Sequence, residues 1–239
     1  MVEKNSRANT AEILESLGAK PSTSEERGLA LIDDSDLVVF CPGISSAGFA
    51  EIRMARANSR RKVIATTIDV KGLAFAEEVI NEVGIKDQIE TRLEDLRGEC
   101  SYPNEYFDTI YARLVLHYLS SQDLDKVLAD FHRTLKQNGR LFIVVRSVKN
   151  VPDREDITYD DQTKLTTITH YQENGEVRYI ESRYFHTPES ICWHLEKAGF
   201  SIEDVEEYQE QLYKDFMRKE LAPNLDHVIE VQAKNMTKV

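Results

Sequence analysis

Long hydrophobic runs are missing from this 239-residue chain. No apolar stretch approaches the ~20 residues that a membrane-spanning helix needs, and Met1 to Thr10 is polar, without the apolar centre of a signal peptide. We therefore expect a cytoplasmic protein with no membrane partner. Cysteine is also scarce: Cys41, Cys100 and Cys192 are far apart and show no paired spacing. This pattern predicts neither a disulfide framework nor a metal site.

Positive charge is in deficit as well. The formal net charge is -12 and the sequence pI is near 5.0, which repels a polyanion at long range and argues against a nucleic-acid partner. One local basic cluster stands out, made of Arg53, Arg56, Arg60, Arg61 and Lys62. No aromatic residues interleave with it for base stacking, so we interpret it as a solvated helix face and loop.

What is present fits one globular domain, with 41% hydrophobic and 30% charged residues. Residues 36–69 read as a buried strand, a turn of small residues, a helix, and a second buried strand that ends in a carboxylate. This layout is typical of α/β proteins that bind an adenosine-containing cofactor. Its turn is poor in glycine, because only Gly43 and Gly48 occur where a standard fingerprint has three. The missing Gly-x-Gly-x-x-Gly run disfavours a nicotinamide-dependent oxidoreductase.

Strands and helices continue to alternate along the chain. Apolar periodicity and helix-stop signals place strands at 37–41, 63–68, 88–91, 107–112 and 141–145, and helices at 47–57, 73–83, 124–135 and 189–198. Five strand–helix units of this kind predict a parallel, doubly wound sheet. Residues 202–208 and 227–233 complete it as an antiparallel pair, and the polar stretch 209–226 between them is expected to hold a helix and a loop.

Two segments lie outside this alternation. Residues 164–171 and 177–184 are rich in Thr, Ile, Tyr and Val and flank Glu173-Asn174-Gly175, which predicts a β-hairpin insertion at about 160–185. It forms either part of a substrate wall or a simple extension of an edge. Residues 1–35 are polar, with short helices expected around 11–17 and 24–31. We interpret them as a helical arm or lid before a domain that spans 36–239.

Several motifs in this order resemble the class I S-adenosylmethionine-dependent methyltransferases, in particular their small-molecule branch. The motifs are Val-Val-Phe-Cys-Pro-Gly-Ile-Ser-Ser-Ala-Gly at 38–48, Ile-Asp ending at Asp69, Leu-Glu-Asp-Leu at 93–96, Tyr-Phe-Asp-Thr-Ile-Tyr-Ala-Arg-Leu-Val-Leu-His-Tyr-Leu at 106–119, Leu-Lys-Gln-Asn-Gly-Arg-Leu-Phe-Ile at 135–143, and the tail from His186-Thr187-Pro188-Glu189 to Ala198-Gly199-Phe200. The resemblance implies a seven-stranded, mostly parallel Rossmann-like sheet with the cofactor across the carboxyl ends of the first strands.

The resemblance also implies which residues bind the cofactor. Gly43, Ile44 and Ser45 would lie against its methionine end, and Asp69 with Val70 would follow the second strand, where a carboxylate suits the two ribose hydroxyls. Asp69 has an alternative role as the N-cap of the next helix, and the two roles are compatible. The position before the glycine turn, acidic in the family, is Cys41 here.

The adenine and acceptor ends are less sharply defined. Leu93, Glu94 and Asp95 are candidates for the adenine end as a group, each with the alternative of a solvated loop position. The segment Tyr111-Ala112-Arg113-Leu114 at the end of the fourth strand should border the reacting methyl group and the substrate. Arg113 pairs either with a carboxylate of the protein or with an anionic substrate. We hold His117, Arg113 and Tyr118 as catalytic candidates, although a histidine in an apolar stretch is more often a packed residue.

The predicted function is methyl transfer from S-adenosylmethionine to a small-molecule acceptor. A sulfonium methyl is already activated, so the protein mainly supplies proximity and alignment, and no catalytic triad or metal is required. The sequence also lacks an Asn-Pro-Pro-Tyr-like tetrapeptide after the fourth strand, which in the family would indicate methylation of a nucleic-acid base. The alternatives are a degenerate, non-catalytic cofactor- or partner-binding protein of the same fold and, less favoured, a nucleic-acid or tRNA methyltransferase.

Overall fold

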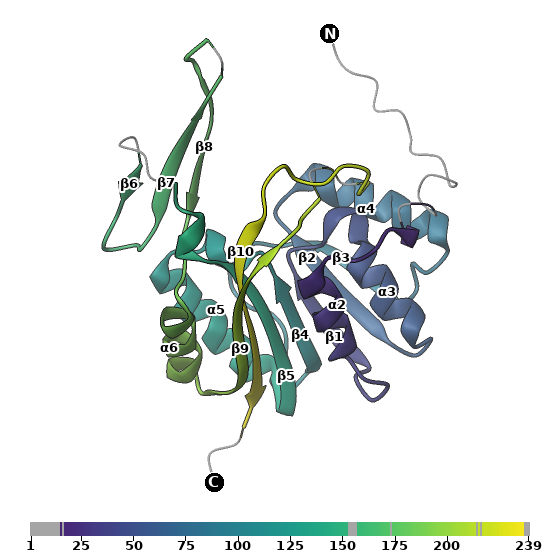
Figure 1. Cartoon of the computed structure of the whole chain (residues 1–239). Coiled ribbons are helices and arrows are strands. Elements are labelled where there is room, and N and C mark those ends of the chain that lie inside the picture. Colours follow the sequence, from purple (N-terminus) through teal and green to yellow (C-terminus); the bar gives the residue numbers. More distant parts are fainter. Residues whose placement is uncertain are drawn as a thin grey trace.

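A seven-stranded sheet forms the body of the protein, with strand order β3-β2-β1-β4-β5-β10-β9 (Figure 1). The computed structural model describes residues 15, 17–152, 157–172, 174–213, 215 and 217–236. The strands of this sheet are β1 (Val38–Pro42), β2 (Lys62–Thr67), β3 (Ile89–Leu93), β4 (Phe107–Arg113), β5 (Leu135–Arg146), β9 (Phe200–Glu210) and β10 (Asp226–Asn235). The first five pair in parallel, and β10 is antiparallel to both β5 and β9. The predicted doubly wound, mostly parallel sheet and its final antiparallel pair are confirmed.

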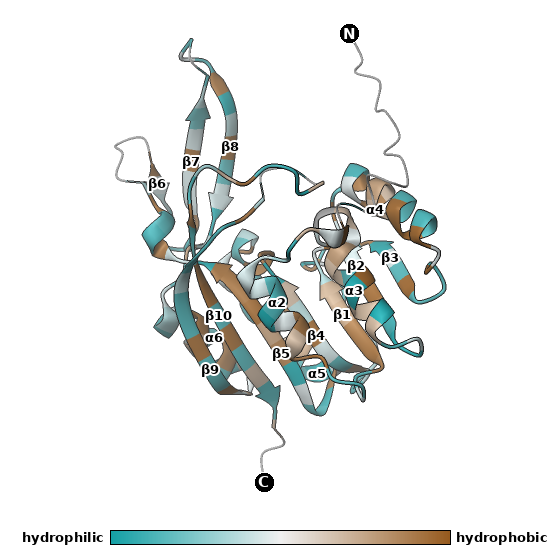
Figure 2. Ribbon diagram, turned by 45° about the vertical axis from the view of Figure 1, so that its right-hand side comes forward, coloured by the Kyte–Doolittle hydropathy of each residue, from teal (hydrophilic) through white to brown (hydrophobic). Residues whose placement is uncertain are grey.

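Helices cover both faces of the sheet. They are α2 (Thr23–Ala30), α3 (Phe49–Ala57), α4 (Val70–Val83), α5 (Ser121–Thr134) and α6 (Pro188–Ala198). One buried cluster joins α5 and α6 to the sheet, and a second joins α2, α3 and α4 to its other face. Successive side chains of a strand point alternately to the two clusters, so the central strands have buried apolar residues on both faces. Figure 2 shows how strongly hydrophobic residues dominate β1 and β5.

The late hairpin is also confirmed. Strands β7 (Thr166–Tyr171) and β8 (Val177–Arg183) are antiparallel, and they extend away from the body of the molecule (Figure 1). A short strand that the sequence did not predict, β6 (Thr158–Tyr159), pairs with the far side of β7. The result is a separate three-stranded sheet of order β6-β7-β8.

Two expected helices differ in their outcome. The helix predicted within 209–226 is absent from the residues described there, which form turns and an isolated bridge between Tyr213 and Leu221. That prediction was wrong: Leu212, Tyr213, Met217 and Leu221 have a helix-like spacing, but contacts with other parts of the chain, such as the pairing of Arg218 with Glu25, hold the described residues as a loop. The helix expected at 11–17 lies largely outside the described residues. No helix in the described part of the chain is long and apolar enough to cross a membrane.

Helix α2 packs closely on the sheet, across β4 and β5 (Figure 2). The contact depends on Gly28, since a Cβ there would lie 2.5 Å from the rings of both Tyr111 and Phe142. These two rings are stacked, with centroids 5.3 Å apart. The segment before the first strand therefore covers part of the core.

The basic cluster of 53–62 is not uniformly solvated, contrary to the prediction. Arg56, Arg60 and Lys62 are exposed, but Arg61 is 1% exposed and donates to the backbone carbonyls of Asp33, Asp36 and Met54. The sequence could not show this, because the carbonyls that accept from Arg61 belong to loops and a helix end whose positions depend on the fold.

Candidate active site

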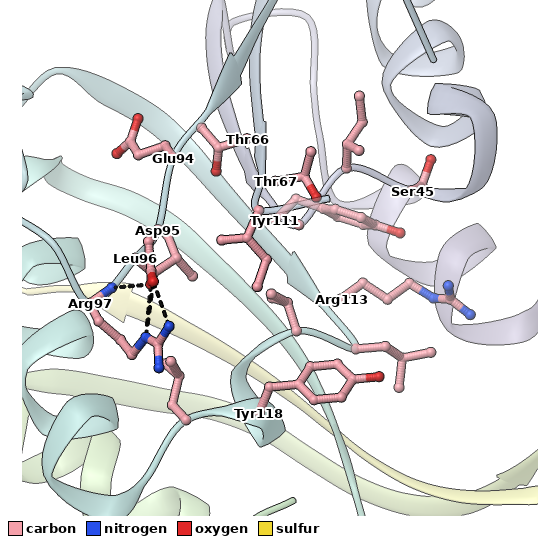
Figure 3. A pocket seen from close by; sticks show the side chains of 16 residues that line it. Ser45, Thr66, Thr67, Glu94, Asp95, Leu96, Arg97, Tyr111, Arg113 and Tyr118 are labelled. Atoms are coloured by element: carbon pink, nitrogen blue, oxygen red, sulfur yellow. Dashed lines mark hydrogen bonds and ion pairs between the residues drawn. The ribbon is translucent and has the colours of Figure 1, made fainter. Parts of the chain in front are cut away.

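A cavity of about 500 Å³ opens at the carboxyl ends of β1, β2, β3 and β4 (Figure 3). In an open α/β sheet this edge is where ligands bind, because the loops that follow neighbouring parallel strands meet there. The lining residues all come from 43–119; they are Gly43, Ile44, Ser45, Thr66, Thr67, Ile68, Glu94, Asp95, Leu96, Arg97, Tyr111, Arg113, Leu114, Val115, Tyr118 and Leu119.

The loop after β1 forms one wall of the cavity. The amides of Gly43 and Ile44 both donate to the carbonyl of Thr66 at 2.8 Å, which holds the loop against the end of β2. Gly43 has φ +77°, and a Cβ there would lie 2.7 Å from Cγ2 of Val115. The backbone can approach the fourth-strand segment this closely only because the residue is glycine.

A buried carboxylate lies behind this loop. Glu51, in the first turn of α3, is 1% exposed; its Oε1 accepts from the Ser45 amide at 3.0 Å and its Oε2 accepts from the Ser45 hydroxyl at 2.5 Å. Burial raises the pKa of Glu51, and the two bonds from Ser45 lower it. Cys41 is itself buried beneath the loop and does not line the cavity; burial and the nearby Glu51 raise the pKa of its thiol.

At the end of β2 the structure shows the cap role of Asp69. Its Oδ1 accepts from the amide of Lys71 at 3.0 Å, at the N-terminus of α4. Asp69 and Val70 are exposed beside the cavity and are not among its lining residues, whereas Ile68 lines it. The ribose role stays a prediction, and capping occupies only one of the two carboxylate oxygens.

After β3, Glu94 and Asp95 line the cavity, and the exposed Leu93 does not. Glu94 accepts from the hydroxyl of Tyr102 at 3.0 Å. Asp95 pairs with Arg97 through Nη2 at 2.6 Å and Nε at 3.0 Å, which lowers the pKa of the Asp95 carboxyl (Figure 3). Arg97 is therefore neutralised, and Glu94 supplies net negative charge to this side.

Arg113 pairs with protein groups. Its Nε donates to the Ser24 hydroxyl at 2.7 Å, and its Nη2 donates to the Ser22 hydroxyl at 2.5 Å and lies 3.4 Å from Glu210. Glu210 in turn accepts from the amide and hydroxyl of Ser24. Of the two options for Arg113, the structure has the protein carboxylate, and its guanidinium extends away from the space between Tyr111 and Tyr118 (Figure 3). The neighbouring Ala112 is fully buried in the strand.

His117 and Tyr118 differ in accessibility. Tyr118 is 55% exposed and lines the cavity, with the Arg183 guanidinium 5.4 Å above its ring. His117 is 1% exposed and does not line the cavity, and neither ring nitrogen has a hydrogen-bond partner among the described residues. Burial, with Arg146 and Arg183 nearby, lowers the pKa of His117 well below its usual value. In this conformation Tyr118 is the candidate placed to contact an acceptor.

A second buried histidine gives the protein an expected sensitivity to acid. Burial lowers the pKa of His186 to about 3, whereas an unfolded histidine titrates near ~6.5. Between these values the unfolded chain binds a proton that the folded chain rejects, so stability falls as the pH drops below about 6.5. The free energy of unfolding of wild type should fall between pH 7 and pH 4.5, and we expect this fall to be about 2 kcal/mol smaller in His186→Asn. Urea unfolding at the two pH values measures the difference. Parallel pH curves for the two proteins would contradict this assignment.

Sequence reasoning missed most of the apolar lining. Ile68, Leu96 and Leu119 gave no signal, because an apolar residue at a strand end is indistinguishable from core. Tyr111, in contrast, belongs to the segment expected to border the methyl group; it lines the cavity from within β4, and burial raises its pKa well above its usual value. Thr66 and Thr67, the last two residues of β2, carried a usable signal: hydroxyls at the end of a buried strand.

Comparison with known proteins agrees with this architecture. Residues 42–143 match a family model described as a methyltransferase domain, and among curated proteins none matches the sequence significantly. An S-adenosylmethionine-dependent methyltransferase structure from Methanosarcina mazei has 14% identity and a TM-score of 0.64, covering 87% of this chain and 95% of its own. The CcbJ methyltransferase of Streptomyces caelestis has 11% identity and a TM-score of 0.67, covering 92% of each chain. The [4+2]-cyclase SpnF has 15% identity and a TM-score of 0.61, covering 90% and 81%.

The sheet order, the site at its carboxyl edge and these matches define a Rossmann-like methyltransferase fold of class I. Residues 42–143 match the methyltransferase-domain model, and S-adenosylmethionine-dependent methyltransferases are among the solved structures that share the fold. The family and the fold support methyl transfer in general. The similarity to SpnF shows that this fold also occurs in a protein described as a cyclase, so the acceptor and the reaction have to be argued from the site.

Proposed function

We propose that the protein transfers a methyl group from S-adenosylmethionine to a small-molecule acceptor. The observation that carries the proposal is the single cavity shared by the ends of β1 to β4, whose volume of about 500 Å³ falls within the range of small-molecule sites. The net charge of -12 supports an acceptor other than a nucleic acid.

The residues around the cavity fit this cofactor. Gly43 has no Cβ, so a ligand can approach the backbone of this wall closely, as the amino-acid end of the cofactor requires. Ile68 and Leu96 offer apolar contact for a flat base, with Glu94 and Asp95 beside them. Asp69 would hold the ribose hydroxyls. We propose these roles together with a covering role for the arm of residues 1–35, whose Ser22 and Ser24 reach Arg113.

When bound, the cofactor supplies an activated sulfonium methyl, and the chain's own groups position the acceptor. Tyr118 is exposed at the cavity and can contact the acceptor. Arg113 is held by Ser22, Ser24 and Glu210, which fixes the segment that follows β4. In-line attack needs close alignment more than acid–base chemistry, so these positioning contacts are the main contribution of the protein.

The acceptor class is tested with S-adenosylmethionine carrying a tritiated methyl group. The protein is incubated with separated small-molecule, RNA and protein fractions of a cell extract, and the label is followed. Label in compounds below about 1 kDa supports the proposal. Label in RNA or protein instead would favour a macromolecular acceptor. If calorimetry shows no binding of either S-adenosylmethionine or S-adenosylhomocysteine, the result favours the non-catalytic alternative. That alternative is motivated by the missing acid at Cys41.

The ribose role of Asp69 predicts a loss of cofactor affinity on substitution. Asp69→Asn keeps an oxygen that can cap α4, so the fold is retained while the charged acceptor is lost. Because a hydrogen bond to a charged group is worth about 1.5–3 kcal/mol, we expect S-adenosylhomocysteine to bind about 10- to 100-fold more weakly by calorimetry. Equal affinities for wild type and Asp69→Asn would show that Asp69 is only a cap.

A further inference from the structure

The loop after β1 lacks the groups that would ordinarily fix it. Cys41 stands where the resemblance expects an acid, and its Sγ lies 3.6 Å from Sδ of Met54 in an apolar, buried setting. A buried thiol in contact with a thioether cannot accept strong hydrogen bonds from loop amides. The Thr66 carbonyl holds the amides of Gly43 and Ile44, so the next residue of the loop, Ser45, needs a partner of its own.

Glu51 makes the missing contacts from the opposite end of the loop. Its two carboxylate oxygens accept the Ser45 amide and the Ser45 hydroxyl, at 3.0 and 2.5 Å. The same hydroxyl oxygen accepts from the amide of Ala50 at 3.1 Å, so Ser45 is tied to the start of α3 by three bonds. All three bonds thus join Ser45 of the loop to two adjacent residues of the first turn of α3, Ala50 and Glu51.

The bonds to Ser45 are important because Glu51 is almost fully buried. A carboxylate at 1% exposure is strongly disfavoured unless hydrogen bonds compensate for the lost solvent, and Ser45 donates to both of its oxygens. Loop and carboxylate are therefore mutually dependent. Both oxygens face Ser45, so Glu51 acts on the cavity through the backbone at 43–45 and does not line it.

We propose that Glu51 is a positioning residue that takes over, from α3, the loop-ordering role of the acid missing at Cys41. By fixing Ser45 it keeps the Gly43 backbone shaped for the amino-acid end of the cofactor. Ser45 is, on this view, a required partner and not a tolerated replacement for glycine. The inference rests on the proposed function, because it assumes that this wall receives the amino-acid portion of S-adenosylmethionine.

Two ligands separate a positioning role from a general structural one. S-adenosylhomocysteine carries the amino-acid end, whereas 5'-methylthioadenosine keeps the adenine, ribose and sulfur and lacks it. We expect Glu51→Ala to weaken the binding of S-adenosylhomocysteine about tenfold or more, and that of 5'-methylthioadenosine less than about threefold, as measured by calorimetry. Glu51→Gln, whose amide can both accept from and donate to Ser45, should bind S-adenosylhomocysteine within about threefold of wild type.

Two controls isolate the effect. Glu230 is equally buried, at 1% exposure, and pairs with Arg27 and Tyr208 outside the cavity, so Glu230→Ala should leave both affinities unchanged. Ser45→Gly restores a glycine and removes the hydroxyl. We expect Ser45→Gly to weaken the binding of S-adenosylhomocysteine selectively. Combined with Glu51→Ala it should lose little more affinity than the weaker-binding of the two single variants. If Glu51→Ala does not fold, Ser45→Gly decides the question.

The outcomes are distinct. Selective loss of S-adenosylhomocysteine binding, rescued by Glu51→Gln, supports the proposal. Equal loss of both ligands, or unchanged binding in Glu51→Ala, overturns it and leaves the proposed function intact. Unchanged or tighter binding by Ser45→Gly overturns it as well. If wild type binds neither ligand, the proposed function fails, and the positioning role fails with it.

Discussion

Arg61→Met should lower the free energy of unfolding by about 3–5 kcal/mol, the largest stability effect that we expect from a single substitution in this chain. The guanidinium of Arg61 is 1% exposed and donates to three backbone carbonyls, those of Asp33, Asp36 and Met54, at 2.5–2.8 Å. Methionine fills a similar volume but donates nothing, so all three carbonyls lose a charged donor, although that of Asp33 keeps the Asp36 amide as a partner at 3.1 Å. Urea unfolding followed by circular dichroism measures the loss, which is a large share of the ~5–15 kcal/mol typical of a domain.

The adjacent residue provides the control for this substitution. Arg60 is exposed, so Arg60→Met removes the same charge from the same loop and should change stability by less than about 0.5 kcal/mol. Arg61→Lys keeps the charge with fewer, differently placed donors, and should lie between the two. Similar losses for Arg60→Met and Arg61→Met would mean that charge, and not the carbonyl contacts, is responsible.

Gly43→Ala should reduce affinity for S-adenosylhomocysteine about 30-fold or more. The new Cβ would lie 2.7 Å from Val115 Cγ2 and 2.8 Å from its Cβ, closer than real contacts allow, so the loop or the segment after β4 must move. Both segments line the cavity, and the cavity therefore changes shape. The backbone at φ +77° adds about 1–2 kcal/mol of strain for any residue with a Cβ.

Gly84 separates strain from shape. It has nearly the same backbone, with φ +76°, but nothing lies within 4 Å of a Cβ placed there. Gly84→Ala should therefore lose about 1 kcal/mol of stability and keep full affinity for the cofactor product. If Gly43→Ala binds as tightly as Gly84→Ala, this wall of the cavity does not receive the ligand.

The sheet was predictable because its strands carry their own signals. Residues 141–145, for example, form an uninterrupted apolar run. A parallel strand that is buried on both faces needs such a run, because all of its side chains lie in the core. Glu94 and Asp95 were candidates because the resemblance places the adenine end after the third strand, and both line the cavity. Local pattern and site position coincide there.

The features that the sequence did not predict depend on contacts between residues far apart in the chain. Arg61 looked solvated because five basic residues in ten normally are, and its three acceptors come from two other parts of the chain. Glu51 gave no signal, since a glutamate in the first turn of a helix is ordinary on electrostatic grounds. Its burial depends on the loop folding back over it. Arg113 was left between two options that only the position of Glu210 distinguishes.

The contact between Arg113, Ser22, Ser24 and Glu210 has a consequence for synthesis on the ribosome. Every residue that lines the cavity lies within 43–119, so the whole lining is translated well before residue 210. The contact of Arg113 with Glu210 can form only later, because Glu210 ends β9. Strand β9 joins the sheet only through β10, which is translated after it. A nascent chain would thus carry every lining residue before the contact that fixes Arg113 exists.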